Sequence, residues 1–333
     1  MVEPSFADYV SLLYTLFERF VQQHTAHSYR GHPFFYQHKV LIVFFLIMQC
    51  LRIFQFETQH RWLTQHPERR QQIGLETIPH RTTLSRRYKA LYPTLQAFLA
   101  FVGQDAPALD AALGSADLYE DKSLFKAHGP VWHQADRQAG RIPDKLRHLD
   151  TDATWGKSAY HGWVYGYGLH LTCNQAGFPK LAQVETAAVS ESQVLDQKEA
   201  IILDGLAPTT LTGDNSYTQA SRIRRWAKRG VLLLTPALKW FKGRYAAAYH
   251  RFIAQPQPAR LLHQRRTAIE PVFDLVAKII GATDNHKQLP IQQLANVRTC
   301  LTLATLTVQI AMLVNNIWGL PPRDISHLMA VFT

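Results

Sequence analysis

The stretch WVYGYGLHLTCNQAGFPKLAQVETA, residues 163–187, decides the fold class. Aromatic and β-branched residues recur through 163–173 and again through 179–187, as is typical of strands. Between them, NQAG (174–177) has the composition of a tight turn. The pattern therefore predicts a β-hairpin.

The segments around this hairpin alternate between strands and helices. A strand is expected at 116–125 before it, and a helix from Ser192, as its cap, to about Leu203 after it. There follow a short strand at 210–214, a helix at 217–229, a buried strand at 231–235, a loop of about 20 residues and helical sequence at 259–281. The order β-β-β-α-β-α-β-α predicts an α/β fold of the ribonuclease H-like type, a mixed sheet with helices on both faces.

Flanking segments complete three expected units. Residues 1–112 are predicted to form an N-terminal helical domain, 113–285 the catalytic domain, and 286–333 a C-terminal helical extension packed on it. The apolar runs 40–48 and 301–314 are expected to be buried helices, because a bilayer span needs about 20 apolar residues. We therefore expect no membrane partner.

No basic stretch followed by an apolar one opens the chain, so no secretory signal is expected. Cys50, Cys173 and Cys300 lie far apart, which favours reduced thiols and an intracellular, cytoplasmic protein.

Positive charge is concentrated in one segment. The chain of 333 residues has a net charge of +11 and is 47% hydrophobic, a composition that excludes disorder. Residues 215–269 hold twelve Lys and Arg and no Asp or Glu, whereas the other 278 residues hold 24 basic and 25 acidic side chains. Since a solvated face usually mixes signs, the segment indicates a polyanionic partner, DNA before RNA or a membrane surface. Lys239, Trp240, Lys242 and Arg244 are its expected DNA contacts.

A second basic element is expected near the N-terminus. A helix following Thr82 or Thr83, either of which can cap it, would turn Arg86, Arg87 and Lys89 outward. This fits a DNA-reading helix, and an ordinary surface helix equally well.

Three acids fall at informative places in the expected fold. Asp121 lies on the first strand, Asp214 follows the fourth, and Glu270 is in the last helical segment. If they converge, three oxygen donors would suit Mg²⁺ or Mn²⁺, and two such ions support phosphoryl transfer. The alternative is structural: Asp214 as a turn residue, and Glu270 paired with Arg266 four residues before it.

The motifs EDKSLFKAHGPVWH (120–133), DTDATWGKS (150–158), GWVYGYGLHL (162–171), LTGDNSY (211–217), RRTAIEPVF (265–273) and IPHRTTLSRR (78–87) together resemble the DDE-type transposases of bacterial insertion sequences. The catalytic domain of that family is like that of retroviral integrases. The resemblance implies that Asp121, Asp214 and Glu270 hold two Mg²⁺ or Mn²⁺ ions. It also implies cleavage at terminal inverted repeats, joining of the freed 3′-hydroxyl to target DNA, and a homodimer on DNA in the nucleoid.

Some positions depart from that family. Its pattern has Tyr and Lys around the third acid, where this chain has His263 and Ala277, with Lys278 one residue late. Arg266 fits, and would orient Glu270 or contact phosphate. Pro271 predicts a helix start or kink at 270–271.

Several assignments stay open. Asp117 is an alternative first acid and Asp274 an alternative third, Asp150 and Asp152 are candidates for a place beside the site, and His128 and His133 are loop residues. A nuclease that cuts without joining, or an inactive DNA-binding relic, are the rival functions.

Overall fold

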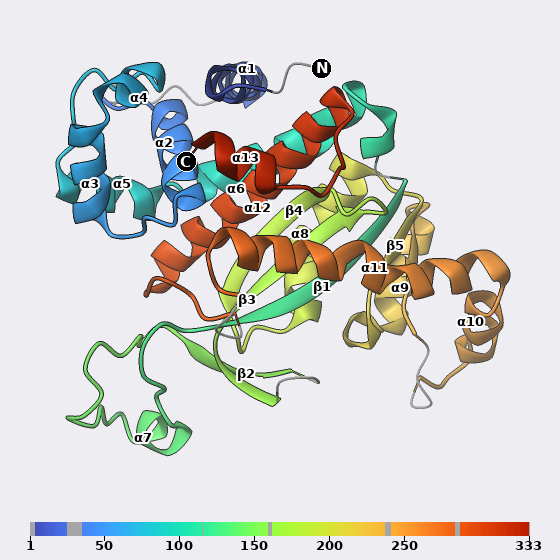
Figure 1. The fold of residues 1–333 in the computed structure, drawn as a ribbon. Coiled ribbons are helices and arrows are strands. Elements are labelled where there is room, and N and C mark those ends of the chain that lie inside the picture. The colour runs from blue at the N-terminus through green and yellow to red at the C-terminus, as the bar shows by residue number, and fades with distance from the viewer. Residues whose placement is uncertain are drawn as a thin grey trace.

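A mixed sheet forms the centre of the protein in this computed structural model (Figure 1). The structure describes residues 4–24, 35–114, 116–158, 162–236, 241–283 and 287–332. Within these, the strands are β1 (Asp117–Lys126), β2 (Thr154–Ser158), β3 (Gly162–Asn174), β4 (Pro179–Thr186), β5 (Thr210–Thr212) and β6 (Leu232–Leu234).

The strand order is β2-β3-β1-β5-β6, and β4 also pairs with β3. β3 runs antiparallel to β1, β2 and β4, whereas β5 is parallel to both β1 and β6. The hairpin predicted at 163–187 is therefore confirmed as β3 and β4, and the α/β class is confirmed with it. No strand was predicted from the sequence at β2.

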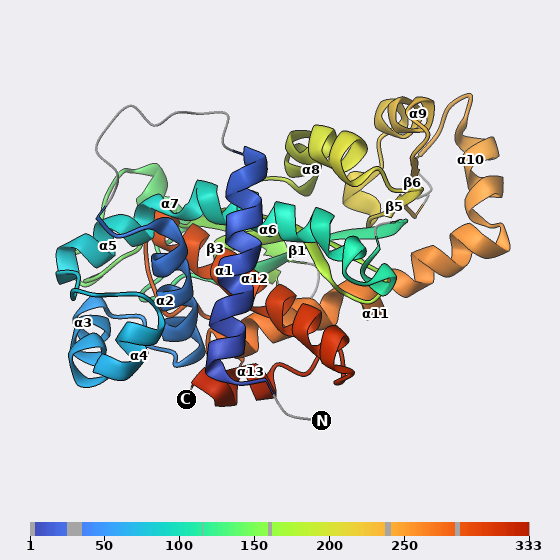
Figure 2. The same cartoon turned by 90° about the horizontal axis from the view of Figure 1, so that it is seen from above.

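Helices surround the sheet. They are α1 (Phe6–His24), α2 (His38–Cys50), α3 (Phe56–Gln65), α4 (Pro67–Gln72), α5 (Arg81–Ala90), α6 (Tyr92–Asp105), α7 (Gln134–Gln138), α8 (Glu191–Ala200), α9 (Ala220–Lys228), α10 (Ala246–Ile253), α11 (Pro256–Ile279), α12 (Leu294–Trp318) and α13 (Ser326–Phe332). α8 continues as a π-helical turn, Ile201–Leu206. Helix α10 occupies part of the region expected to be a loop, and it projects from the β6 end of the sheet (Figures 1 and 2).

The two faces of the sheet bury different helices (Figure 2). Residues of α8 and α9 share a hydrophobic cluster with Leu118 of β1 and Leu181 of β4. The opposite face, with Tyr119 and Leu171, packs against α11 and α12 in a larger cluster that also takes in α1, α2 and α6. Side chains alternate between the two faces along each strand.

The apolar helix α12 lies at the centre of the larger cluster. It is long and apolar enough to cross a membrane, but 94% of its most apolar window is buried within the protein. It packs against β4, α2, α5, α6 and α11. The predicted burial of the runs 40–48 and 301–314 is therefore confirmed, and the three cysteines are free and buried.

Helix starts differ from the sequence prediction in two places. The cap of α8 is Ser190, whose Oγ accepts from the Gln193 amide, so the helix begins two residues earlier than a Ser192 cap would allow. Helix α5 is capped by the His80 ring, which accepts from the Thr82 amide, and not by Thr82 or Thr83. A neutral imidazole nitrogen accepts as a carboxylate or hydroxyl would, although it is rare in this role.

Of the helix start or kink predicted at 270–271, the start is wrong. Helix α11 begins at Pro256 and contains Pro271 in its interior. Proline has no N–H for the carbonyl four residues before it, here that of Thr267. The guanidinium of Arg323 donates to that carbonyl at 3.2 Å and to the next one, of Ala268, at 3.4 Å. A side chain from outside the helix thus supplies the donor that Pro271 lacks.

Candidate metal centre

Three carboxylates from three elements meet beyond the end of β5. Asp121 of β1, Asp214 after β5 and Glu191 at the start of α8 each offer an oxygen atom, and these oxygens lie within 4.8 Å of one another. The sheet register explains the first two. β5 pairs in parallel with β1 as far as Tyr119↔Thr212, so residues 121 and 214, two further on, are neighbours.

The turn that carries Asp214 is fixed by its neighbours. Asp214 Oδ1 accepts from the Ser216 amide at 2.8 Å and caps a short 3₁₀ helix, Asn215–Tyr217. A Cβ on Gly213 would lie 2.6 Å from Cδ2 of the Tyr217 ring. Only glycine therefore allows that ring to fold under the turn.

Glu191 was not foreseen from the sequence, because an acid in the first turn of a helix is the ordinary partner of the helix dipole. Its position is determined by the start of α8. Ser190 caps the helix immediately before it, and Lys122 Nζ donates to the carbonyls of Ala187 and Val189 at 2.9 and 2.8 Å. Lys122 follows Asp121 on β1, so one strand holds both Asp121 and the loop leading to Glu191.

The negative charge of the cluster is only partly compensated. Burial raises the pKa of Asp121 to about 7; the Arg265 guanidinium lowers it, and the nearby Asp214 and Glu191 carboxylates raise it further. Burial likewise raises the pKa of Glu191, and Asp214 adds to that rise. Partly buried carboxylates that repel one another are stabilised by a cation. Three hard oxygen donors fit Mg²⁺ or Mn²⁺.

Glu270 does not join this cluster. It is on the exposed side of α11, where its carboxylate lies 3.6 Å from the guanidinium of Arg266. Arg266, Glu270, Asp274 and Lys278 follow one another at four-residue spacing along that exposed side. Asp274 lies 3.4 Å from Lys287, whose Nζ reaches Ser123 Oγ of β1 at 3.2 Å. The structure thus brings together Asp121 and Asp214 of the predicted triad, and places Glu270 outside them.

The other acids considered from the sequence have structural partners. Asp117 accepts from Thr210 Oγ1 at 2.6 Å, a bond between β1 and β5. Asp150 and Asp152 accept from the backbone amides of Gln293 and Leu294 at 3.1 and 2.9 Å. They therefore bind the amide groups at the start of α12.

The basic segment 215–269 is partly neutralised inside the protein, which corrects the picture of twelve free cations. Five of its arginines form ion pairs with acids outside the segment: Arg222 with Asp196, Arg225 with Asp196 and Glu199, Arg229 with Asp204, Arg265 with Asp121, and Arg266 with Glu270. Counting charges along the sequence missed the pairs of Arg222, Arg225 and Arg229 because their partners lie on α8 and in its continuation. Lys242 and Arg244 are exposed, and Arg224 and Arg244 both lie over the Tyr245 ring. Lys239 and Trp240 lie outside the described residues.

Helix α5 exposes fewer cations than predicted. Arg86 is exposed, but Arg87 is buried and donates to the carbonyl of Tyr36 at 3.0 Å. Lys89 donates to Gln293 Oε1 at 2.9 Å. The expectation that Arg87 faces outward is therefore wrong, because that position of the helix faces the chain just before α2.

Comparison with known proteins agrees with the motifs. A family model described as a transposase DDE domain matches residues 138–287, a range that includes Glu191, Asp214 and Glu270 and begins after Asp121. No curated protein matches the chain. A cryo-EM structure of the piggyBac transposase synaptic complex with hairpin DNA is similar at 10% identity and a TM-score of 0.47, covering 97% of this chain and 79% of that one. Residues 138–287 thus match the transposase DDE domain, and the resemblance to DDE transposases seen in the sequence is confirmed.

Proposed function

We propose that the protein is a DNA transposase with a ribonuclease H-like catalytic domain. It would cut a phosphodiester bond at the ends of a mobile element, free a 3′-hydroxyl and join it to target DNA. The carboxylate cluster of Asp121, Glu191 and Asp214 is the observation that carries this proposal. It lies beyond the carboxyl end of β5 and beside Asp121 of β1, the usual kind of place for a site in an open α/β sheet.

These carboxylates are the groups that would hold Mg²⁺ or Mn²⁺. Two such ions would activate the attacking oxygen and stabilise the leaving oxygen. The chain's own residues would hold these ions and orient the scissile phosphate. No covalent bond to the protein is needed for an in-line displacement.

The role of Glu270 rests on the family resemblance. As the third ligand it would have to leave Arg266 and turn toward Asp121 when DNA binds. Both side chains are on the exposed side of α11. Arg266 would then be available for a phosphate.

The DNA partners proposed are the terminal inverted repeats and the target duplex. The exposed cations Lys242, Arg244 and Lys278, with Arg86 on α5, are the described residues assigned to phosphate contacts. Lys239 and Trp240 keep the role expected from the sequence. Because two ends must be cut together, we propose a homodimer on DNA, acting in the cytoplasmic nucleoid.

The test is a cutting and joining assay. Duplexes carrying both flanks of the chain's own gene are incubated with the protein and Mg²⁺ or Mn²⁺. Asp121→Asn and Asp214→Asn are expected to abolish cutting and to leave DNA binding nearly unchanged. Pre-cut ends supplied with a target plasmid are expected to be joined.

The rival functions predict different outcomes of the same assay. Cutting without any joining of pre-cut ends would indicate a nuclease. Binding without cutting by the parent would indicate a DNA-binding relic. Equal cutting by Asp121→Asn and the parent would show that the carboxylate cluster takes no part in cutting.

A further inference from the structure

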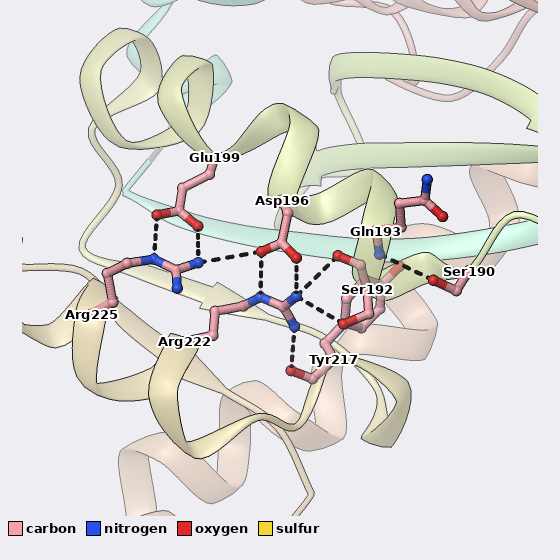
Figure 3. A network of polar contacts seen from close by, with 8 residues as sticks. All are labelled: Ser190, Ser192, Gln193, Asp196, Glu199, Tyr217, Arg222 and Arg225. Carbon is pink, nitrogen blue, oxygen red and sulfur yellow. Dashed lines mark hydrogen bonds and ion pairs between the residues drawn. The ribbon is translucent and has the colours of Figure 1, made fainter.

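A fully buried arginine lies directly behind the carboxylate cluster. Arg222, on α9, has no exposed surface, although arginine is rarely buried completely. Its guanidinium makes five hydrogen bonds (Figure 3). Two of them form a bidentate pair with Asp196 of α8, at 3.1 and 2.7 Å.

The other three bonds reach the two segments that carry acids. Arg222 Nη2 donates to the carbonyl oxygen of Ser192 at 3.0 Å and to its Oγ at 2.8 Å, one residue after Glu191. Nη1 donates to the carbonyl of Tyr217 at 3.1 Å, at the end of the 3₁₀ helix that Asp214 caps. One rigid, planar group thus joins the first turn of α8 to the turn after β5.

The bonds of Arg222 oppose the electrostatic repulsion between two carboxylates of the cluster. The carboxylates of Glu191 and Asp214 repel each other across a distance of less than 4.8 Å, and they come from elements that share no strand pairing. Lys122 ties the loop before Glu191 to β1 through the carbonyls of Ala187 and Val189, neither of which belongs to the Asp214 turn. The Ser216 side chain, in the Asp214 turn, also hydrogen-bonds the Glu191 carboxylate. Arg222 adds bonds to the backbones of both segments, on the side of the cluster that the sheet leaves open.

We infer that Arg222 is a positioning residue that sets the separation of Glu191 and Asp214 and so the affinity of the cluster for a divalent cation. The inference rests on the proposed metal-binding function of the cluster. Arg222 acts through the backbone of Ser192 and Tyr217 and does not touch the cation. Groups of this kind typically change metal affinity by about 10- to 100-fold when they are removed.

Arg225 provides a matched control on the same helix. It is half exposed and pairs with Asp196 and Glu199, but no bond joins it to Ser192 or Tyr217 (Figure 3). Arg222→Lys and Arg225→Lys both keep the charge and lose the planar fork. Only the first loses the link between the two acid-bearing segments, because an ammonium group cannot donate in the fixed directions of a guanidinium.

The experiment measures Mn²⁺ binding by calorimetry on the full chain without DNA. Arg222→Lys is expected to weaken binding at least about tenfold, and Arg225→Lys less than about twofold. Hydrogen exchange should rise in residues 191–196 and 214–218 of Arg222→Lys alone. If Arg222→Lys does not fold, Ser192→Ala removes one of the three linking bonds, and a smaller weakening of the same sign is expected.

The outcomes separate this inference from the proposed function. If the parent binds no Mn²⁺, the proposed function is contradicted, and hydrogen exchange alone decides whether Arg222 links the two segments. If the parent binds and Arg222→Lys binds equally well, with unchanged exchange in both segments, the positioning role is wrong. If Arg225→Lys weakens Mn²⁺ binding as much as Arg222→Lys does, Arg222 stabilises the fold in general and has no specific positioning role.

Discussion

The guanidinium of Arg265 forms an ion pair with Asp121, and both side chains are more than four-fifths buried. Arg265 is therefore the cation that faces the carboxylate cluster in the described structure. It comes from α11, the helix that also carries Glu270. Residues five apart on a helix differ by about 140° in direction, so the two side chains cannot face Asp121 in the same way.

Replacing Arg265 is expected to make divalent cations bind more tightly. Arg265→Gln removes a positive charge that competes for the Asp121 oxygens, so Mn²⁺ affinity should rise roughly tenfold, or by about 1.4 kcal/mol. Calorimetry on the full chain without DNA provides the measurement. Arg266→Gln, which frees Glu270 instead, is the control and should leave that affinity nearly unchanged. A rise with Arg266→Gln but not Arg265→Gln would place Glu270 in the site of the free protein.

The ion pairs of the basic segment predict which cations contribute to DNA affinity. Neutralising Lys242 and Arg244 together should reduce the slope of log affinity against log salt by about 2, since each phosphate contact contributes about 0.9. Arg229→Gln, which removes a cation already paired with Asp204, should leave the slope nearly unchanged. Fluorescence anisotropy with a labelled duplex, at salt concentrations of about 50 to 200 mM, measures the slope for both variants. The same slope for all variants would show that DNA does not contact Lys242 and Arg244.

His170 predicts a loss of stability in acid. Burial, with the cations Lys198 and Lys122 facing it, lowers the pKa of His170 to about 2 in the folded protein. Below about pH 6.5 the unfolded chain binds a proton that the folded one does not, so the free energy of unfolding falls by up to 1.4 kcal/mol, roughly, per pH unit. The Glu120 carboxylate on the same face pairs with Lys198 and accepts a hydrogen bond from Thr172 Oγ1, and burial raises its pKa.

His170→Leu should remove the part of the acid-induced loss of stability that comes from His170. Neither ring nitrogen of His170 has a hydrogen-bond partner among the described residues, so the substitution breaks no such bond. Urea unfolding at pH 7.5 and 5.5 should show a smaller acid-induced loss in the variant, by about 1 kcal/mol. His263→Leu, at an exposed position on α11, is the control. An identical pH dependence in parent and His170→Leu would contradict the prediction.

Pro271 and Arg323 should be energetically coupled. Arg323→Met leaves the Thr267 carbonyl without a donor, because Pro271 cannot supply one. In a Pro271→Ala background the alanine N–H takes that place, so Arg323→Met should cost about 1 kcal/mol less. A double-mutant cycle from urea unfolding measures the difference. Additive effects of the two substitutions would show that the guanidinium does not substitute for the missing N–H.

The sequence predicted what depends on local pattern. Strand periodicity and turn composition located β1, β3 and β4, and the position of Asp214 after a short strand placed it beside Asp121 once parallel pairing was assumed. The pairing Tyr119↔Thr212 realises that expectation in the structure. The order of the local elements and the assumption of parallel pairing are therefore enough to predict that two of the three clustered acids, Asp121 and Asp214, lie together.

Contacts between distant segments could not be predicted in this way. Glu191 resembles an ordinary first-turn acid until Arg222 and Lys122 fix the start of α8. The charge of 215–269 appeared free because its acidic partners, such as Asp196 and Glu199, lie on another helix. Pro271 appeared to break a helix because nothing local to it reveals Arg323.

Helix α12 also limits how such a chain can acquire new specificity. It packs against α2, α5 and α6 and also against β4 and α11, so residues before and after position 112 share a single interior. The residues before position 112 cannot be exchanged as a unit between relatives without also changing the residues that pack against α12. Evolution or engineering toward other DNA ends would therefore proceed by changing solvent-facing side chains on a conserved scaffold.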